Sequence, residues 1–314
     1  MGSDIFVSFI LERPKMTLTI PRIDVHVHFY TARDLARVSG DVPYTLPAPH
    51  PIKRYLDTLI DSGVSPTLLN NVHLSILPDS ENVFASFDEL AGLQERDPLR
   101  YGSVRLVGTI LADPFYASVE RLAHPQVQGV RIVLHDAIPE VLRDDAYAGA
   151  EWQQLFAGLR ADQHVHVYAQ EAAVNLKVLR QLPKRVPVLI DHLGTCHSER
   201  GADDPAFDAL LHEASERGNV YFKGPGYRTA IDAAAALPFA VRIVERVGAH
   251  RLLLEASDAP HVGDRDGRAY ADHFTPLAAF DFAARLARAT AARTGTTADA
   301  LLRGASAEIF PTSP

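Results

Sequence analysis

Two histidines spaced two residues apart, His26 and His28, are the first residues in the chain whose types and spacing could do chemistry. Apolar and polar residues alternate over 23–28, which is typical of a short strand. Side chains two apart in a strand point to one face, so we expect both imidazoles and Asp24 to project together. Such a pair can bind a divalent metal, or orient and protonate a substrate oxygen. Two partly buried histidines that only hydrogen-bond to backbone atoms are the alternative.

The elements that must position these histidines follow a regular rhythm of apolar strands and amphipathic helices. This rhythm predicts an α/β protein, a (β/α)8 barrel in a single domain. An open doubly wound sheet is the rival, but no Gly-x-Gly-x-x-Gly follows the first strand. The expected strands cover 22–29, 66–73, 103–112, 128–134, 164–168, 186–192, 219–223 and 251–258, and the expected helices 53–62, 82–95, 117–123, 151–161, 172–181, 205–217, 229–247 with a break at Pro238, 276–294 and 298–310.

Polar residues stand where these strands end, and a barrel gathers strand ends around one mouth. We therefore expect one site that contains the first two histidines and further residues: His73, Arg131, Tyr168, His192, Lys223 and Asp258. Each residue also has a structural alternative. Asp258 and His192 could cap turns, and Arg131 could pair with a carboxylate inside the barrel. His164 stands at the start of its strand and is expected to be structural.

Composition limits the partners of the protein. The 314 residues are 47% hydrophobic with a formal net charge of −8 and a pI near 5.9, so no basic field invites nucleic acid or an anionic membrane. One cysteine, Cys196, excludes an intrachain disulfide and favours a reducing, cytoplasmic location. No apolar run is long enough to cross a membrane. A small-molecule substrate is the expected partner, and a homo-oligomer is left open.

The first residues carry no secretion-signal pattern. Residues 1–16 are expected to form a disordered leader, with Met16 as an alternative start, and the barrel is expected over 17–314.

Four motifs in this order resemble the amidohydrolase superfamily, and within it the branch of 2-pyrone-4,6-dicarboxylate lactonase and the sugar-lactone hydrolases. The motifs cover 24–28, 129–131, 191–194 and 251–261, and the resemblance runs from Ile23 to Phe310. It implies a (β/α)8 barrel enzyme that hydrolyses the C–O bond of a cyclic ester.

Roles follow from the resemblance residue by residue. It implies that Asp258 is the general base for water, and that His26, His28 and His192 polarise the carbonyl. Ester hydrolysis needs a base and donors aimed at the developing negative charge, so this division is chemically sound. Arg228 resembles a residue that binds the substrate carboxylate, and positions near the substrate are matched by Tyr168 and Tyr44. We expect the remaining strand-end residues to contact the substrate as well: His73, Arg131 and Lys223.

Two departures from the branch bear on the substrate. Thr195 and Gln128 stand where the dicarboxylate lactonase has arginines. The absence of these two arginine guanidinium groups disfavours a ligand with two carboxylates, so a monoanionic or neutral lactone is expected.

A third departure bears on metal. Tyr168 stands where metal-dependent relatives have a fifth-strand histidine, and His166 could replace it only if the strand register shifts by two. A metal site could still form from His26, His28 and Asp258. We expect no required cofactor, or one weakly bound divalent metal such as Zn²⁺.

A lactone hydrolase is therefore the leading interpretation. A metal-dependent decarboxylase of an aromatic or muconate-type acid could use the same barrel. A barrel that binds a ligand without catalysis is the second alternative.

Overall fold

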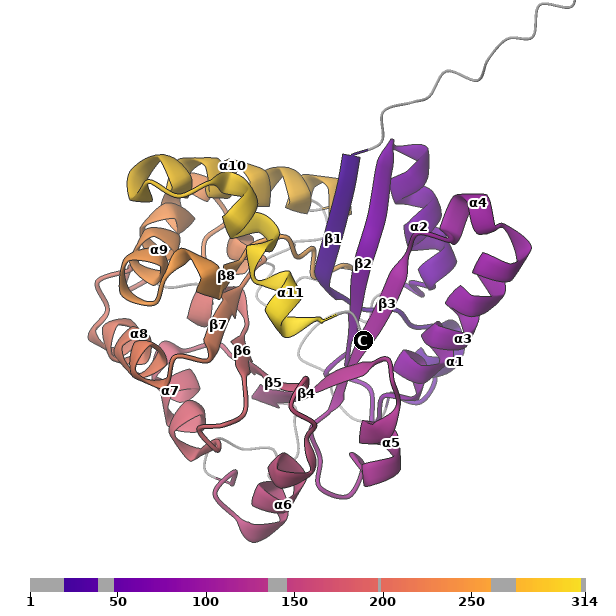
Figure 1. The fold of residues 1–314 in the computed structure, drawn as a ribbon, viewed down its shortest axis with the longest axis horizontal. Coiled ribbons are helices and arrows are strands. Elements are labelled where there is room, and N and C mark those ends of the chain that lie inside the picture. The colour runs from indigo at the N-terminus through magenta and orange to yellow at the C-terminus, as the bar shows by residue number, and fades with distance from the viewer. Residues whose placement is uncertain (1–19, 39–47, 135–145, 197–198, 261–274, 312–314) are drawn as a thin grey trace, which may run out of the picture.

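The computed structural model describes residues 20–38, 48–134, 146–196, 199–260 and 275–311, so the expected leader lies outside the described residues. Eight parallel strands form one sheet in chain order, and helices surround it (Figure 1). This arrangement confirms the predicted (β/α)8 barrel. The strands are β1 (Ile20–Val27), β2 (Val64–Val72), β3 (Arg105–Leu111), β4 (Val127–Leu134), β5 (His164–Ala169), β6 (Val188–Ile190), β7 (Val220–Lys223) and β8 (Leu252–Leu253).

Most helices agree with the predicted ranges to within a few residues, and α1 and α4 are short additions. The helix predicted over 298–310 is instead divided into the π-helical turn Ala300–Gly304 and the short helix α11. No described helix is long and apolar enough to span a membrane. The helices are α1 (Ala32–Leu35), α2 (Ile52–Asp61), α3 (Glu81–Arg96), α4 (Pro98–Tyr101), α5 (Val119–Ala123), α6 (Ala150–Gly158), α7 (Ala172–Gln181), α8 (Pro205–Arg217), α9 (Ala233–Arg246), α10 (Pro276–Thr294) and α11 (Ser306–Ile309).

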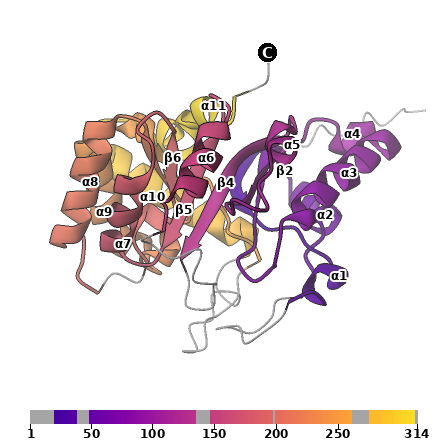
Figure 2. The same ribbon diagram turned by 90° about the horizontal axis from the view of Figure 1, so that it is seen from below.

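The inside of the barrel is divided into an apolar end and a polar end. The apolar end is a cluster of inward side chains with α11 packed against it: Ile23, Val25, Leu68, Val107, Leu189, Tyr221, Leu253, Ala256, Ala305, Ile309 and Phe310. Figure 2 shows α11 at one end of the barrel and the arrow of β4 pointing away from it. The polar residues therefore gather at the opposite end, where the strands finish.

The barrel closes between β1 and β8 with few strand hydrogen bonds. Val27 and Ala259 form an isolated parallel bridge, and the Val25 amide donates to Glu255 O at 3.2 Å. The predicted strand over 251–258 is much shorter than expected, because Leu254 donates to Leu301 O in the π-helical turn Ala300–Gly304. The chain after β8 therefore leaves the sheet, and the Asp258 amide donates to His26 O at the mouth.

The predicted break at Pro238 is absent, because α9 continues through this residue. Proline removes one helical hydrogen bond and clashes with the preceding turn. The helix buries Ala236, Phe239, Ala240 and Ile243 against the barrel, and we infer that this packing offsets the local cost.

Gly129 gives a test of how closely β4 and β5 approach. A Cβ added at this position would lie 2.5 Å from His164 O, a backbone atom that cannot move cheaply. Gly129→Ala is therefore expected to lower the free energy of unfolding by about 1–3 kcal/mol in urea titrations. Gly158→Ala is the matched control, because its Cβ would meet only Leu122 Cδ1 at 4.0 Å. Equal stability of the two variants would contradict the strand packing.

Candidate active site

A β-bulge in β1 sets the direction of the first two histidines. The register with β2 shifts between Asp24 and Val27. Val25 belongs to the inner cluster, whereas Val27 packs in the outer layer between strands and helices. The bulge lets His26 and His28 both face the interior of the barrel, where each contacts Asp258.

Asp24 does not share this face, so the prediction that it projects with the two histidines is wrong. Its carboxylate accepts hydrogen bonds from the amides of His26 at 3.1 Å and Ser257 at 2.9 Å. The hydroxyl of Tyr55, on α2, donates to it at 2.5 Å. Burial raises the pKa of Asp24 to about 6, against the lowering effect of these donors. Asp24 therefore ties β1 to α2 and to the segment after β8.

His192 and Asp258 are held in left-handed backbone conformations, with φ of 50° and 54°. Such values are uncommon outside glycine and cluster at functional sites, although Asp and His adopt them more readily than most residues. The Asp258 amide donates to His26 O at 2.6 Å. Thr229 Oγ1 donates to His192 O at 2.5 Å. These bonds fix the two turns that direct both side chains into the mouth.

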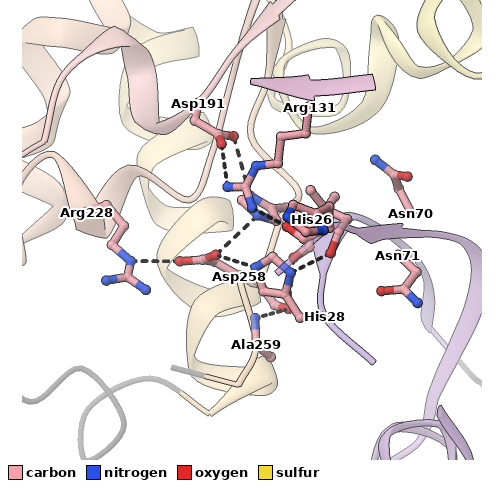
Figure 3. Close-up of polar contacts among 12 residues, drawn as sticks. His26, His28, Asn70, Asn71, Arg131, Asp191, Arg228, Asp258 and Ala259 are labelled. Atoms are coloured by element: carbon pink, nitrogen blue, oxygen red, sulfur yellow. Dashed lines mark hydrogen bonds and ion pairs between the residues drawn. The ribbon is translucent and has the colours of Figure 1, made fainter. Parts of the chain in front are cut away.

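Asp258 lies between a cation and two imidazoles (Figure 3). Arg228 Nε donates to its Oδ2 at 2.7 Å, and its Oδ1 lies 3.3 Å from the Nε2 atoms of both His26 and His28. Burial acts to raise the pKa of Asp258, but the guanidinium of Arg228 lowers it well below the usual range. Asp258 is therefore an ionised carboxylate at neutral pH.

The histidines around Asp258 are neutral. Burial lowers the pKa of His26 and His28, and it lowers the pKa of His192 to about 3. The rings of His26 and His192 stack with centroids 5.8 Å apart. His28 Nδ1 lies 2.7 Å from Val72 O and must donate to it, so neutral His28 presents an acceptor at Nε2.

A second charged layer, centred on Asp191, lies against His26. Asp191 Oδ1 is 2.5 Å from Lys223 Nζ and 2.6 Å from His166 Nε2, and Arg131 donates to Oδ2 at 2.9 Å. Asp191 is fully buried, and although burial acts to raise its pKa, these partners lower it well below its usual value. Asp191 thus holds Lys223, His166 and Arg131 together inside the barrel.

The structure places two predicted substrate-binding residues in this layer. Lys223 is fully buried against His26 and Asp191. Arg131 pairs with Asp191 and donates to His73 O at 2.6 Å, which is the structural alternative that the sequence left open. His73 is buried beside it, with Nδ1 3.1 Å from Ser80 Oγ. The polar groups of Lys223, Arg131 and His73 therefore contact other groups of the protein, and these contacts hold the residues of the site in place.

The remaining predicted residues lie in different places: Tyr168 is at the mouth, His164 is at the closed end of the barrel, and Tyr44 is not among the described residues. The ring of Tyr168 meets His192 edge-on at 5.3 Å, so it borders the site. Tyr44 lies outside the described residues. His164 packs against Phe310 at 5.4 Å, at the closed end of the barrel, as predicted.

Sequence reasoning missed Asp191 and His166 as members of this constellation. The signal for Asp191 was an acidic residue directly after the apolar strand β6. The signal for His166 was its place two residues before Tyr168 in β5, on the same face.

Two sets of described side chains bring three ligand atoms within 4.8 Å of one another: His26, His28 and Asp258, and His26, Asp191 and His192. Neither set fits a divalent ion well. Asp258 already pairs with Arg228, and Asp191 with Lys223 and Arg131. A metal would add a further cation beside guanidinium and ammonium groups in a buried site. We therefore derive no chemical step through a metal.

Comparisons with known proteins agree with this architecture. An amidohydrolase family model matches residues 23–302. A probable 2-pyrone-4,6-dicarboxylic acid hydrolase from Acinetobacter baumannii, solved with citric acid bound, has a TM-score of 0.70 at 18% identity, over 93% of this chain and 99% of that chain. No curated protein matches the chain.

Two further structures share the fold. A Pseudomonas putida protein, provisionally described as a 2-pyrone-4,6-dicarboxylic acid hydrolase, has a TM-score of 0.62 at 24% identity, over 93% of this chain and 97% of that chain. An Agrobacterium tumefaciens protein in its apo form has a TM-score of 0.59 at 22% identity, over 94% of this chain and 98% of that chain. Identities this low show a common fold, whereas the family match spans most of the sequence. The chain belongs to the amidohydrolase family of hydrolytic enzymes.

Proposed function

We propose that this protein hydrolyses a small lactone that carries one carboxylate, with Asp258 as the general base. The observation that carries the proposal is the position of Asp258: an ionised carboxylate whose Oδ1 lies 3.3 Å from the Nε2 atoms of His26 and His28. Structures of similar fold include proteins described as 2-pyrone-4,6-dicarboxylic acid hydrolases, and a 2-pyrone ring is a lactone.

The reaction begins when Asp258 removes a proton from water as the water oxygen attacks the lactone carbonyl carbon. His28 supports the water, because its Nε2 is an acceptor next to Asp258 Oδ1. Imidazole N–H groups of His26 and His192 donate to the carbonyl oxygen as negative charge develops there. The ring C–O bond then breaks, and the proton held by Asp258 passes to the leaving oxygen. The product is an open-chain hydroxy acid or its keto tautomer.

The charge of the site favours one carboxylate on the substrate. Among the three cations described at the site, Arg131 and Lys223 pair with Asp191, and their side chains are buried, with exposed fractions of 5% and 0%. The side chain of Arg228 is 21% exposed, so Arg228 is the one cation of the three that a substrate carboxylate can reach. We propose that Arg228, which also pairs with Asp258, binds the substrate carboxylate.

Thr195 and Gln128, which stand where the dicarboxylate lactonase has arginines, add no positive charge to the site. Thr195 and Gln128 are buried and neutral, and Thr195 Oγ1 donates to Gln170 O at 3.3 Å. A second substrate carboxylate would therefore be desolvated without a matching cation from either position.

A charge series of lactones tests the proposal. Neutral 2-pyrone, a 2-pyrone monocarboxylate, 2-pyrone-4,6-dicarboxylate and a neutral sugar lactone would be compared by proton release in a pH-indicator assay. The monocarboxylate is expected to have the highest kcat/KM, about tenfold or more above the others, which corresponds to about 1.4 kcal/mol.

Arg228→Gln is the matched variant for this series. This variant should reduce the difference in kcat/KM between the monocarboxylate and the neutral lactones, because it removes the cation that binds the substrate carboxylate. Hydrolysis of no lactone, or a tenfold preference for the dicarboxylate, would contradict the proposal.

A further inference from the structure

Lys223 is a fully buried lysine at the end of β7, and its surroundings are unusual for a cation. Its Nζ lies 2.5 Å from Asp191 Oδ1, 2.5 Å from His26 Nδ1 and 3.3 Å from Gly224 O. A buried lysine is normally placed to satisfy a carboxylate. Here one of its neighbours is the ring of a histidine that faces Asp258.

The three neighbours of Lys223 match the hydrogen-bonding capacity of an ammonium group. An ammonium has three donors and no acceptor, and Asp191 Oδ1, His26 Nδ1 and Gly224 O are three acceptors. His26 Nδ1 must then supply a lone pair. A neutral imidazole carries one proton, so this proton is on Nε2, the atom 3.3 Å from Asp258 Oδ1.

We propose that Lys223 is a positioning residue that fixes His26 in the tautomer protonated on Nε2, and that this tautomer prevents His26 from binding a metal through Nε2. The role of this N–H toward a carbonyl oxygen rests on the proposed function. The tautomer and its effect on metal binding do not.

The contrast with His28 supports this inference. Metal-binding histidines usually donate their second ring N–H to an oxygen, which leaves the other nitrogen free to ligate. His28 has this arrangement, because Nδ1 donates to Val72 O at 2.7 Å. His26 has the reverse, because its Nδ1 faces the ammonium donor of Lys223.

Removal of the lysine should reverse the tautomer. Asp191 Oδ1 lies 3.4 Å from His26 Nδ1 and can accept a proton from it once the ammonium is gone. His26 Nε2 would then carry a lone pair next to His28 Nε2 and Asp258 Oδ1. Lys223→Met is thus expected to let this group bind a divalent metal more tightly through His26 Nε2 and His28 Nε2, while Asp258 keeps its pair with Arg228.

Nitrogen-15 NMR of histidine side chains tests the tautomer in the wild-type protein, with the His26 signal assigned by its loss in His26→Gln. The signal is expected to show a protonated Nε2 and an unprotonated Nδ1. A protonated Nδ1 would overturn the proposal. This measurement needs no lysine variant, so it holds even if Lys223→Met does not fold.

Titration with Co²⁺, followed by its visible absorption, tests the effect on metal. Lys223→Met is expected to bind Co²⁺ about 10- to 100-fold more tightly than the wild type, the usual size of an effect from a residue behind a ligand. Lys53→Met is the control for a lysine on the surface, and Lys223→Arg should retain the weak binding of the wild type. Equal affinity in the wild type and Lys223→Met would contradict the inference. Neither measurement uses a lactone, so failure of the proposed function would be seen separately.

Discussion

Replacing Asp258 by asparagine is expected to lower kcat on the true substrate by about 10²- to 10⁴-fold, the usual contribution of a general base. Asparagine has the same shape but cannot accept a proton from water. It also adopts left-handed backbone conformations readily, so the turn with φ of 54° should persist. The variant is therefore expected to fold and to bind substrate with little change in KM. Steady-state kinetics and circular dichroism would measure these effects.

Asp281→Asn is the matched control for this prediction. Asp281 pairs with Arg285 on the exposed surface of α10, so its loss should leave kcat unchanged. Retention of near wild-type kcat by Asp258→Asn would show that another group activates water. Loss of the folded state would be visible in the circular dichroism spectrum and would be distinguished from loss of catalysis.

Acidification from pH 6 to pH 4 is expected to destabilise the protein strongly. Burial lowers the pKa of His73, His164 and His192 to about 3 in the folded state. In the unfolded state these histidines titrate near 6.5, so the unfolded chain binds more protons in this range. The contribution of the buried, neutral histidines to the free energy of unfolding is fully present above pH 6.5 and is lost as the pH falls toward 3.

The size of this effect follows from the number of protons. Each proton changes the free energy of unfolding by about 1.4 kcal/mol per pH unit, so the three histidines lose roughly 8 kcal/mol between pH 6 and pH 4. Asp24 acts in the opposite sense, because its pKa is raised to about 6 and its protonation in the folded state returns roughly 2 kcal/mol between pH 6 and pH 4. These four groups together therefore lower the free energy of unfolding by roughly 6 kcal/mol (8 − 2), a large part of a typical domain stability of about 5–15 kcal/mol.

Thermal unfolding followed by circular dichroism at pH 7.5, 6.5, 5.5 and 4.5 would measure this loss. Tm should fall progressively below pH 6.5. A Tm that stays constant down to pH 4.5 would show that these histidines are not held neutral. His212→Gln, on α8, is a control variant that should follow the wild-type curve.

Much of the fold could be predicted because a parallel barrel leaves a strong signal in the sequence. Strands buried on both faces read as apolar runs, and helices between them show one apolar stripe. The β1 bulge was not predictable from alternation, because an extra residue changes the phase without changing composition. The shortness of β8 was also missed, because Leu254 bonds to a helical turn that is distant in sequence.

The candidate site was predicted in part for a similar reason. Strand ends converge in a barrel, so the meeting of His26, His28, His192 and Asp258 followed from topology alone. Depth along the barrel axis does not follow from strand position. Lys223 was therefore expected at the substrate but lies against Asp191, a carboxylate whose partners come from three other strands.

We propose that Asp258 opens a lactone without the help of a metal. The most direct measurement follows proton release and carbon dioxide release together, using chelator-treated protein and a 2-pyrone monocarboxylate. Lactone hydrolysis predicts one proton released for each ring opened, no carbon dioxide, and a rate unchanged by the chelator. Carbon dioxide release that stops on chelation and returns with added metal would contradict the claim and would identify a metal-dependent decarboxylase.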